Sequence, residues 1–365
     1  MTESFVETRA VEAERSWVPT DGVLLEVDQL QVEFRTKEGV AHAINGVSFD
    51  LREGETLAIL GESGSGKSVT AQAIMGILDT PPGYVTGGEV RYCGTDLLSQ
   101  DEEIRRSVRG AEIAMVFQDA LSALNPVFPV GWQIAEMFRK HRGMNRADSL
   151  EQAVRLMERV QIPGARQRVK AFPHQFSGGM RQRIMIAMSI ALDPAILIAD
   201  EPTTALDVTV QAQIMQLLAE LQAERKMGLI LITHDLGVVA DVADRIAVMY
   251  AGKIVESAEV FELYAQPQHP YTKGLLESIP RLDQKGQDLA AIGGLPPNLM
   301  HIPDGCAFHP RCKYAQDICR EEPAPLLRQL GKSRHSACHF AEDLAVAEPT
   351  NSELADTTQQ GRELR

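Results

Sequence analysis

The stretch Gly61–Ser68 reads Gly-Glu-Ser-Gly-Ser-Gly-Lys-Ser, and it stands between the apolar run Thr56–Leu60 and a helical pattern from Val69 to Leu78. Small residues let successive backbone N–H groups turn toward phosphate oxygens, and the next helix points its positive N-terminal end at the same charge. The order of strand, glycine loop and helix therefore predicts a phosphate-binding loop rather than a glycine-rich turn without a nucleotide. We expect nucleotide contacts from Gly61, Glu62, Ser63, Gly64, Ser65, Gly66, Lys67 and Ser68. Lys67 would reach the β- and γ-phosphates, and the Ser68 hydroxyl would ligate Mg²⁺.

The length, composition and net charge of the chain limit the classes of protein to which it can belong. The chain has 365 residues, 44% of them hydrophobic, which predicts one large domain and a smaller one. The net charge of −14 disfavours a partner that is nucleic acid. No apolar run approaches the roughly 20 residues of a membrane-spanning helix, and residues 1–20 contain no signal-peptide core, so we expect a cytoplasmic chain.

The N-terminal part is predicted to form strands. Alternating apolar and polar residues in Leu24–Phe34 and Ala41–Leu51 indicate an antiparallel pair, with Phe34 either stacking on adenine or packing in the core. Glu89–Cys93 and the apolar run Ile113–Phe117 are further expected strands. Gln118 follows the last of them, at the strand end where ligands of an open α/β sheet are usually bound.

Helical periodicity replaces the strand pattern between about residues 119 and 172. It is followed by Ser177, Gly178 and Gly179 ahead of the apolar helix Ile184–Leu192. Ser177 is a natural N-cap, and the two glycines allow a ligand to approach the helix N-terminus closely. Taken alone, this pattern is only a helix cap.

Acidic residues and a histidine end two later apolar strands. Ala195–Ala199 leads into Asp200 and Glu201, and Leu229–Thr233 leads into His234. Asp200 could serve as an outer ligand of Mg²⁺, and Glu201 could polarise the water that attacks the γ-phosphate. His234, in register with Gln118 and Glu201, could donate a hydrogen bond to that phosphate.

These motifs, in this order and spacing, resemble the ATP-binding subunits of ABC transporters over residues 23 to 340. The resemblance implies that Ser177, Gly178 and Gly179 bind the ATP held by a partner subunit. It also implies adenine stacking by Phe34, a link from Mg²⁺ to the helical insertion through Gln118, and a place for Asp207 in the dimer loop. The usual family signature is Leu-Ser-Gly-Gly-Gln, and here Phe176 and Met180 replace its first and last residues, which leaves open whether both composite ATP sites are equally active.

The later part of the chain resembles the C-terminal extension of peptide-importer ATPases, most closely the D-type ATPase of oligopeptide importers. His269-Pro270-Tyr271 and Gly305–Cys312 carry this similarity. It implies an ATPase at the cytoplasmic face of the inner membrane that powers import of oligopeptides or dipeptides. The implied partners are a second, different ATPase subunit, two membrane permease subunits and an extracytoplasmic peptide-binding protein. Nickel chelates and glutathione remain alternative cargoes, and the rival classes are a soluble ABC-type ATPase of DNA repair or translation and a metabolic kinase.

The expected fold is an α/β P-loop NTPase sheet core with an N-terminal antiparallel β subdomain, a helical insertion and a small irregular C-terminal extension. The expected boundaries are a flexible arm at 1–22, a nucleotide-binding domain at 23–265 with a helical subdomain at about 119–175, an extension at 266–340, and a disordered tail at 341–365.

Four cysteines gather in the extension, namely Cys306, Cys312, Cys319 and Cys338. Four thiolates could hold a [4Fe–4S] cluster or zinc, although neither ferredoxin nor zinc-ribbon spacing is matched. The resemblance to peptide-importer ATPases favours the iron–sulfur cluster, with zinc and reduced structural cysteines as alternatives. Cys93 lies alone on an expected strand and is predicted to be a core residue.

Overall fold

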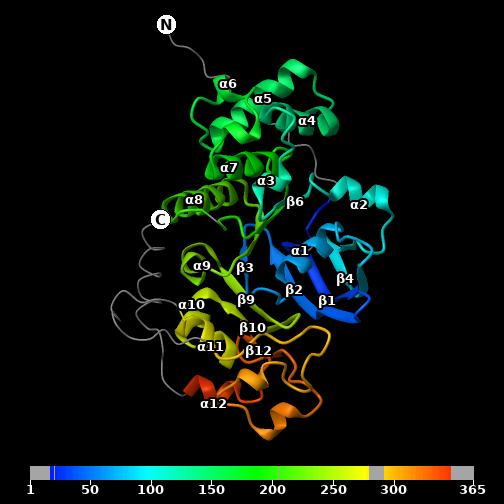
Figure 1. Cartoon of the computed structure of the whole chain (residues 1–365), viewed down its shortest axis with the longest axis vertical. Coiled ribbons are helices and arrows are strands. Elements are labelled where there is room, and N and C mark those ends of the chain that lie inside the picture. The colour runs from blue at the N-terminus through cyan, green and yellow to red at the C-terminus, as the bar shows by residue number, and fades with distance from the viewer. Residues whose placement is uncertain (1–16, 20, 205, 279–291, 347–365) are drawn as a thin grey trace.

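The computed structural model describes residues 17–19, 21–204, 206–278 and 292–346. Helices form one end of its long axis, a large sheet lies in the middle, and the segment after residue 292 forms the other end (Figure 1). A second, antiparallel sheet lies beside the large one. The α/β class and the antiparallel N-terminal sheet expected from the sequence are confirmed.

The antiparallel sheet has the strand order β2-β1-β4-β5. Its strands are β1 (Val23–Arg35), β2 (Val40–Arg52), β4 (Gly83–Tyr92) and β5 (Thr95–Asp96). The predicted pair β1 and β2 is thus confirmed within two residues at each end. β4 begins at Gly83, six residues before the expected Glu89. The additional residues pair with β1, although glycines such as Gly87 and Gly88 usually weaken a strand.

The large sheet has the order β11-β12-β10-β9-β3-β8-β7-β6. Neighbouring strands from β9 to β6 run parallel, whereas β10 and β12 join the sheet antiparallel. Its strands are β3 (Thr56–Leu60), β6 (Ile113–Val116), β7 (Ile196–Asp200), β8 (Gly228–Ile232), β9 (Arg245–Tyr250), β10 (Lys253–Glu259), β11 (Arg328–Gln329) and β12 (His335–Ser336). Every residue of β3, β6, β7 and β8 is buried, as expected for parallel strands covered on both faces.

The carboxyl ends of these parallel strands meet at one edge of the sheet. The phosphate loop follows β3 there, and α1 (Lys67–Met75) begins directly after the loop. Gln118, Glu201 and His234 follow β6, β7 and β8 within two residues. Strand topology therefore brings motifs together that are far apart in the sequence.

The expected helical insertion consists of short helices between β6 and β7. They are α3 (Ala120–Ala123), α4 (Val130–Arg142), α5 (Arg146–Arg159), α6 (Ala165–Arg168), the 3₁₀ turn η1 (Pro173–Gln175) and α7 (Gly178–Ser189). Asn145 caps α5 by accepting hydrogen bonds from the backbone N–H groups of Ala147 and Asp148. The buried Arg183 of α7 donates to the carbonyl of Val160 at 2.9 Å and to Gln213 at 3.0 Å, and so fixes α7 against its neighbours.

Further helices cover the large sheet and build the extension. They are α2 (Glu102–Val108), α8 (Val208–Arg225), α9 (Leu236–Val242), α10 (Val260–Ala265), α11 (Pro270–Glu277), η2 (His309–Arg311), η3 (Asp317–Arg320) and α12 (Ala341–Val346). The extension adds β11 and β12 to the edge of the sheet beside β10. A helix thus stands where the disordered tail was expected to begin, and residues 347–365 lie outside the described part of the chain.

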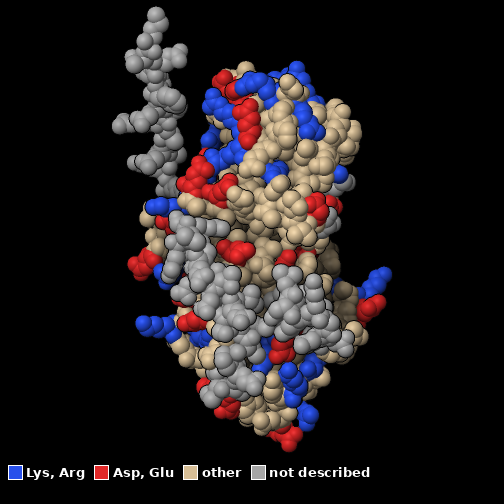
Figure 2. Space-filling view, turned by 90° about the vertical axis from the view of Figure 1, so that its left-hand side faces the viewer, with Lys and Arg blue, Asp and Glu red and all other residues tan. Residues whose placement is uncertain are grey.

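Acidic and basic side chains are interspersed on the face drawn in Figure 2, in keeping with the net charge of −14. In the described ranges, none of the helices combines the length and the apolar character needed to cross a bilayer.

Candidate functional site

The phosphate loop has a backbone that requires glycine at two positions. Gly61 has a φ of 153° and Gly66 has a φ of 107°, a region that other residues rarely adopt. A Cβ atom at Gly61 would lie 2.3 Å from the carbonyl oxygen of Met249, and one at Gly66 would lie 2.7 Å from that of Ala43. The predicted loop is therefore packed closely against the backbone of its neighbours, and neither position has room for a side chain.

Lys67 opens the helix that follows the loop and is buried. Its ammonium group donates to the carbonyl oxygens of Gly61 at 2.8 Å and Glu62 at 3.0 Å. Burial lowers the pKa of Lys67, while the negative charges of Glu201, Asp200 and Glu62 oppose that shift. A buried cation that only backbone carbonyls satisfy is well suited to exchange them for phosphate oxygens.

Ser68 and Asp200 approach each other across the edge of the sheet. The Ser68 hydroxyl donates to Asp200 Oδ1 at 3.0 Å. Burial raises the pKa of the Asp200 carboxyl group, and the hydrogen bond from Ser68 partly offsets this. A hydroxyl and a carboxylate oxygen beside a phosphate loop are the donor types that Mg²⁺ prefers, so these residues fit the expected ion.

Gln118, Glu201 and His234 form one cluster, although they come from three strands. Gln118 Nε2 donates to Glu201 Oε2 at 2.9 Å, and His234 Nδ1 lies 3.5 Å from Glu201 Oε1. The Thr204 hydroxyl also donates to Glu201 Oε2, at 2.8 Å. Glu201 has a φ of 44°, a left-handed conformation that is rare for glutamate and turns its side chain away from the strand path.

The Ser177–Gly179 segment lies at the start of α7, as predicted. Ser177 is the N-cap and accepts from the Met180 N–H at 3.4 Å. Gly179 packs so closely on α8 that an added Cβ would lie 2.5 Å from Val210. Asp207 caps α8 by accepting from the Val210 N–H at 3.0 Å.

Phe34 lies near the end of β1 and is half-buried. It packs against the hydrophobic cluster beneath the antiparallel sheet. That packing agrees with the core alternative, although a half-buried ring keeps one part accessible to a ligand.

Sequence reasoning missed the residues that hold Glu62 from the C-terminal side of the chain. These are Arg311, whose guanidinium group pairs with the Glu62 carboxylate, and Tyr271, whose hydroxyl accepts from the Glu62 N–H. Both lie in motifs that carried the family resemblance, but neither motif indicated a contact with the phosphate loop. The separation of 249 residues between Arg311 and Glu62 leaves no local signal.

The iron–sulfur cluster expected at the four C-terminal cysteines is a wrong prediction, and the zinc alternative fails with it. Across the described ranges, no three His, Cys, Asp or Glu side chains are grouped so that they could hold a metal ion. The four cysteines, Cys306, Cys312, Cys319 and Cys338, instead line a cavity of about 20 Å³, room for about one water molecule.

Burial also changes the pKa values of three of these thiols. It raises the pKa of Cys306 and Cys312, and it raises the pKa of Cys338 to about 12. Cys319 and Cys338 are buried and Cys306 and Cys312 are partly buried, and such thiols pack as small apolar groups. The spacing matched neither the ferredoxin nor the zinc-ribbon pattern, and the expectation rested on residue type and on the family resemblance.

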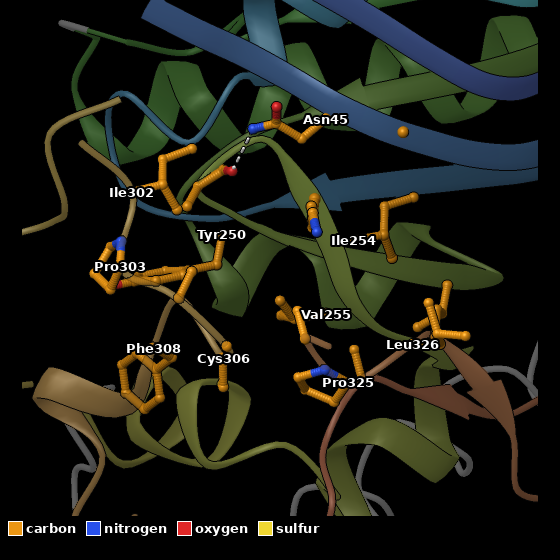
Figure 3. A pocket seen from close by; sticks show the side chains of 18 of the residues that line it. Asn45, Tyr250, Ile254, Val255, Ile302, Pro303, Cys306, Phe308, Pro325 and Leu326 are labelled. Atoms are coloured by element: carbon orange, nitrogen blue, oxygen red, sulfur yellow. Dashed lines mark hydrogen bonds between the residues drawn. The ribbon is translucent and has the colours of Figure 1, made fainter. Parts of the chain in front are cut away.

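A larger cavity of about 740 Å³ lies between the antiparallel sheet, the β9–β10 hairpin and the extension. Figure 3 shows Tyr250 and Phe308 at one side of it and Asn45 at another, where Asn45 Nδ2 donates to the Ala251 carbonyl at 3.3 Å. None of the residues predicted to bind ATP lines this cavity. It is therefore separate from the cluster at the sheet edge.

Comparison with known proteins matches both parts of the chain. The sequence model of the family described as ABC transporter matches residues 44–204, and that of the oligopeptide/dipeptide transporter C-terminal region matches residues 255–319. The chain is 50% identical over 316 residues to the oligopeptide transport ATP-binding protein OppD of Salmonella typhimurium, covering 87% of this chain and 93% of that protein. It is 51% identical over 306 residues to the dipeptide transport ATP-binding protein DppD of Bacillus subtilis, covering 84% and 91%.

Solved structures give the same result for the core. The dimeric post-hydrolysis state of the ATP-binding cassette MJ0796 bound to ADP and Pi is similar with a TM-score of 0.59 and 27% identity. The match covers 65% of this chain and 99% of that one. The similarity thus spans a whole solved cassette, and about a third of this chain lies outside it.

Proposed function

The chain belongs to the ABC transporter family, among the oligopeptide and dipeptide transport ATP-binding proteins, and from this premise we propose that it binds and hydrolyses ATP to drive peptide import. The observation that carries the proposal is the meeting of Lys67, Ser68 and Asp200 with Gln118, Glu201 and His234 at one sheet edge. The cargo class rests on the oligopeptide/dipeptide C-terminal region and on the names of the relatives.

Each side chain has a proposed role in hydrolysis. Lys67 leaves its carbonyl partners for the β- and γ-phosphates, and Ser68 and Asp200 hold Mg²⁺, which neutralises phosphate charge when bound. Glu201 orients the attacking water and accepts its proton, and the hydrogen bonds from Gln118 and Thr204 hold its carboxylate in place at the strand end. His234 donates to the γ-phosphate, and Gln118 connects the site to the helical insertion.

We assign the remaining parts of the transporter by resemblance. Ser177, Gly178 and Gly179 bind the ATP of a second, different ATPase subunit, and Asp207 lies at the contact between the two subunits. The pair docks on two permease subunits at the cytoplasmic face of the inner membrane, and an extracytoplasmic protein delivers the peptide. The helical subdomain, about residues 119–175, passes the closing motion of the ATPase dimer to the permease.

The variant Glu201→Gln tests this proposal. In the assembled transporter it should bind ATP with nearly unchanged affinity and lose at least about 99% of turnover and peptide uptake, because positioning survives while proton acceptance is lost. Equilibrium ATP binding, phosphate release and uptake of a labelled peptide are the measurements. Glu103→Gln, an exposed carboxylate of α2, serves as the control and should leave all three unchanged. Near-normal phosphate release by Glu201→Gln would contradict the role of Glu201.

A further inference from the structure

Glu62, the second residue of the phosphate loop, is paired with an arginine of the C-terminal extension. Arg311 Nη1 lies 2.6 Å from Glu62 Oε2, and Arg311 Nη2 lies 2.9 Å from Oε1. This is a bidentate pair, the strongest geometry that a guanidinium and a carboxylate can form. The Arg311 side chain is only 5% exposed, so solvent screens the pair much less than an ordinary surface ion pair.

The backbone of Glu62 is held as well. Its N–H group donates to the Tyr271 hydroxyl at 2.8 Å, and its carbonyl oxygen accepts from Lys67 Nζ at 3.0 Å. Tyr271 belongs to α11, whereas Arg311 ends η2. Two separate segments after the nucleotide-binding core therefore converge on one residue of the phosphate loop, and that residue in turn contacts the lysine expected to bind phosphate.

Arg311 is itself fixed in place. Its Nε donates to the Gly293 carbonyl at 2.9 Å, and its guanidinium carbon lies 5.9 Å from the ring centres of both Tyr250 and Phe308. The rings of Tyr250 and Phe308 meet edge to face at 5.2 Å beside the large cavity (Figure 3). The hydrogen bonds with Glu62 raise the pKa of Arg311 above its usual value, so its charge is permanent.

The charge of Glu62 needs such a partner. A carboxylate inside a loop that receives a triphosphate would repel the ligand and attract Lys67 away from it. Arg311, which belongs to the extension, neutralises the negative charge of the Glu62 carboxylate. The Lys67 ammonium group then remains available to bind the phosphates. Its two-pronged contact also fixes the direction of the Glu62 side chain, which a single-point contact from lysine could not do.

We propose that Arg311, together with Tyr271, is a positioning residue of the ATP site: it neutralises Glu62 and holds the phosphate loop, so that the C-terminal extension is part of the nucleotide-binding machinery. The inference rests on the proposed function, in which this loop binds ATP. It differs from a purely structural role, in which the same ion pair would fasten the extension to the core without any effect on the nucleotide.

The test uses the full-length chain and the variants Arg311→Gln, Glu62→Gln and the double variant. Equilibrium binding of a fluorescent ATP analogue with Mg²⁺ gives the affinity, and thermal unfolding gives the stability. Arg311→Gln should weaken ATP binding by about tenfold or more, because an unpaired carboxylate then faces the phosphates. The double variant should recover to within about threefold of the parent, because no uncompensated charge remains. In the assembled transporter, Arg311→Gln should raise KM for ATP more than it lowers kcat.

Two further variants sharpen the result. Arg311→Lys keeps the charge but not the fork and should lie between the parent and Arg311→Gln, which also keeps the test usable if Arg311→Gln does not fold. Arg320→Gln removes an exposed arginine of the extension that pairs with Asp317, and it should leave ATP affinity unchanged.

Unchanged ATP affinity in Arg311→Gln with lowered thermal stability would overturn the proposal and leave the pair a structural fastening. A double variant that binds ATP no better than Arg311→Gln would overturn the charge argument. A parent chain that binds no ATP at all would instead contradict the proposed function, so the two failures are distinguishable.

Discussion

Gly66 shows how strongly a single backbone position determines the phosphate loop. Its φ of 107° is unfavourable for any residue with a Cβ atom, and that atom would also lie 2.8 Å from Ile44 Cδ1 and 2.7 Å from a backbone oxygen. Gly54 has a comparable left-handed φ of 72°, yet nothing lies within 4 Å of its added Cβ. A side chain at Gly54 would therefore meet backbone strain alone, whereas a side chain at Gly66 would meet both strain and a steric clash.

We expect Gly66→Ala to abolish measurable ATP binding, since strain of about 1–3 kcal/mol in the loop adds to a clash with the backbone oxygen of Ala43 in β2. Gly54→Ala should lower the free energy of unfolding by about 1 kcal/mol and leave ATP affinity intact. Fluorescent-nucleotide titration and urea unfolding of both variants check this. Parent-like ATP affinity in Gly66→Ala would show that the loop can relax around a methyl group.

The helix α11 depends on a buried histidine at its start. His269 is the N-cap, and its Nδ1 accepts from the Tyr271 N–H at 3.1 Å. Burial lowers the pKa of His269 to about 3, and burial raises the pKa of the neighbouring Glu256 to about 7. The Glu256 carboxylate accepts from the N–H groups of Gln268 and His269, and the positive charge of Arg334 partly offsets its shift.

The two groups change stability with pH in opposite directions. The folded pKa of His269 lies below its unfolded value, so its contribution to stability is lost as pH falls below about 6.5. The folded pKa of Glu256 lies above its unfolded value, so its contribution is present below about pH 4.5 and is lost as pH rises toward 7. Between about pH 4.5 and 6.5, the opposite effects of His269 and Glu256 on the free energy of unfolding of the parent chain therefore partly cancel.

Replacing His269 with Asn keeps a capping acceptor and removes the titration. From pH 7 to pH 5, the free energy of unfolding of His269→Asn should rise relative to the parent by roughly 2 kcal/mol, because only the parent loses the histidine contribution. Urea unfolding at several pH values measures the difference, and His301→Asn, an exposed histidine, serves as the control. A difference that is constant with pH would contradict the buried, neutral state of His269.

For the whole molecule, the periodicity of the sequence predicted most helices and strands. It predicted contacts between distant residues only where the ends of parallel strands meet at one edge of the sheet. Gln118, Glu201 and His234 could be expected together, because three parallel strands end at one edge. The pairing of Arg311 with Glu62 could not, because the extension lacks helical or strand periodicity and its contacts cross 249 residues. The prediction for the cysteines failed for a related reason: residue type and family resemblance suggested a ligand set, whereas only the three-dimensional arrangement shows that the described side chains are not grouped to hold a metal ion.

An exposed apolar segment, Val127 and Phe128, lies inside the helical insertion, between α3 and α4. Val127 is 70% exposed and Phe128 is 38% exposed, and the Phe128 ring stacks on Trp132 with centres 4.3 Å apart. The buried Gln133 holds this segment by donating to the carbonyls of Asn125 and Phe128, both at 2.9 Å. An exposed apolar segment that begins nine residues after Gln118 and is held by these hydrogen bonds is suited to contact a permease.

Replacing both Val127 and Phe128 with serine should therefore uncouple the transporter. Peptide uptake per ATP hydrolysed should fall at least about fivefold, because apolar contact with the permease is lost, while ATP binding by the chain alone should stay as in the parent. Uptake and phosphate release in reconstituted vesicles measure this ratio. Leu295→Ser removes an 87% exposed leucine of the extension and should leave the ratio unchanged. If the double variant imports peptide with parental coupling, the motion of the ATP site reaches the permease through another surface.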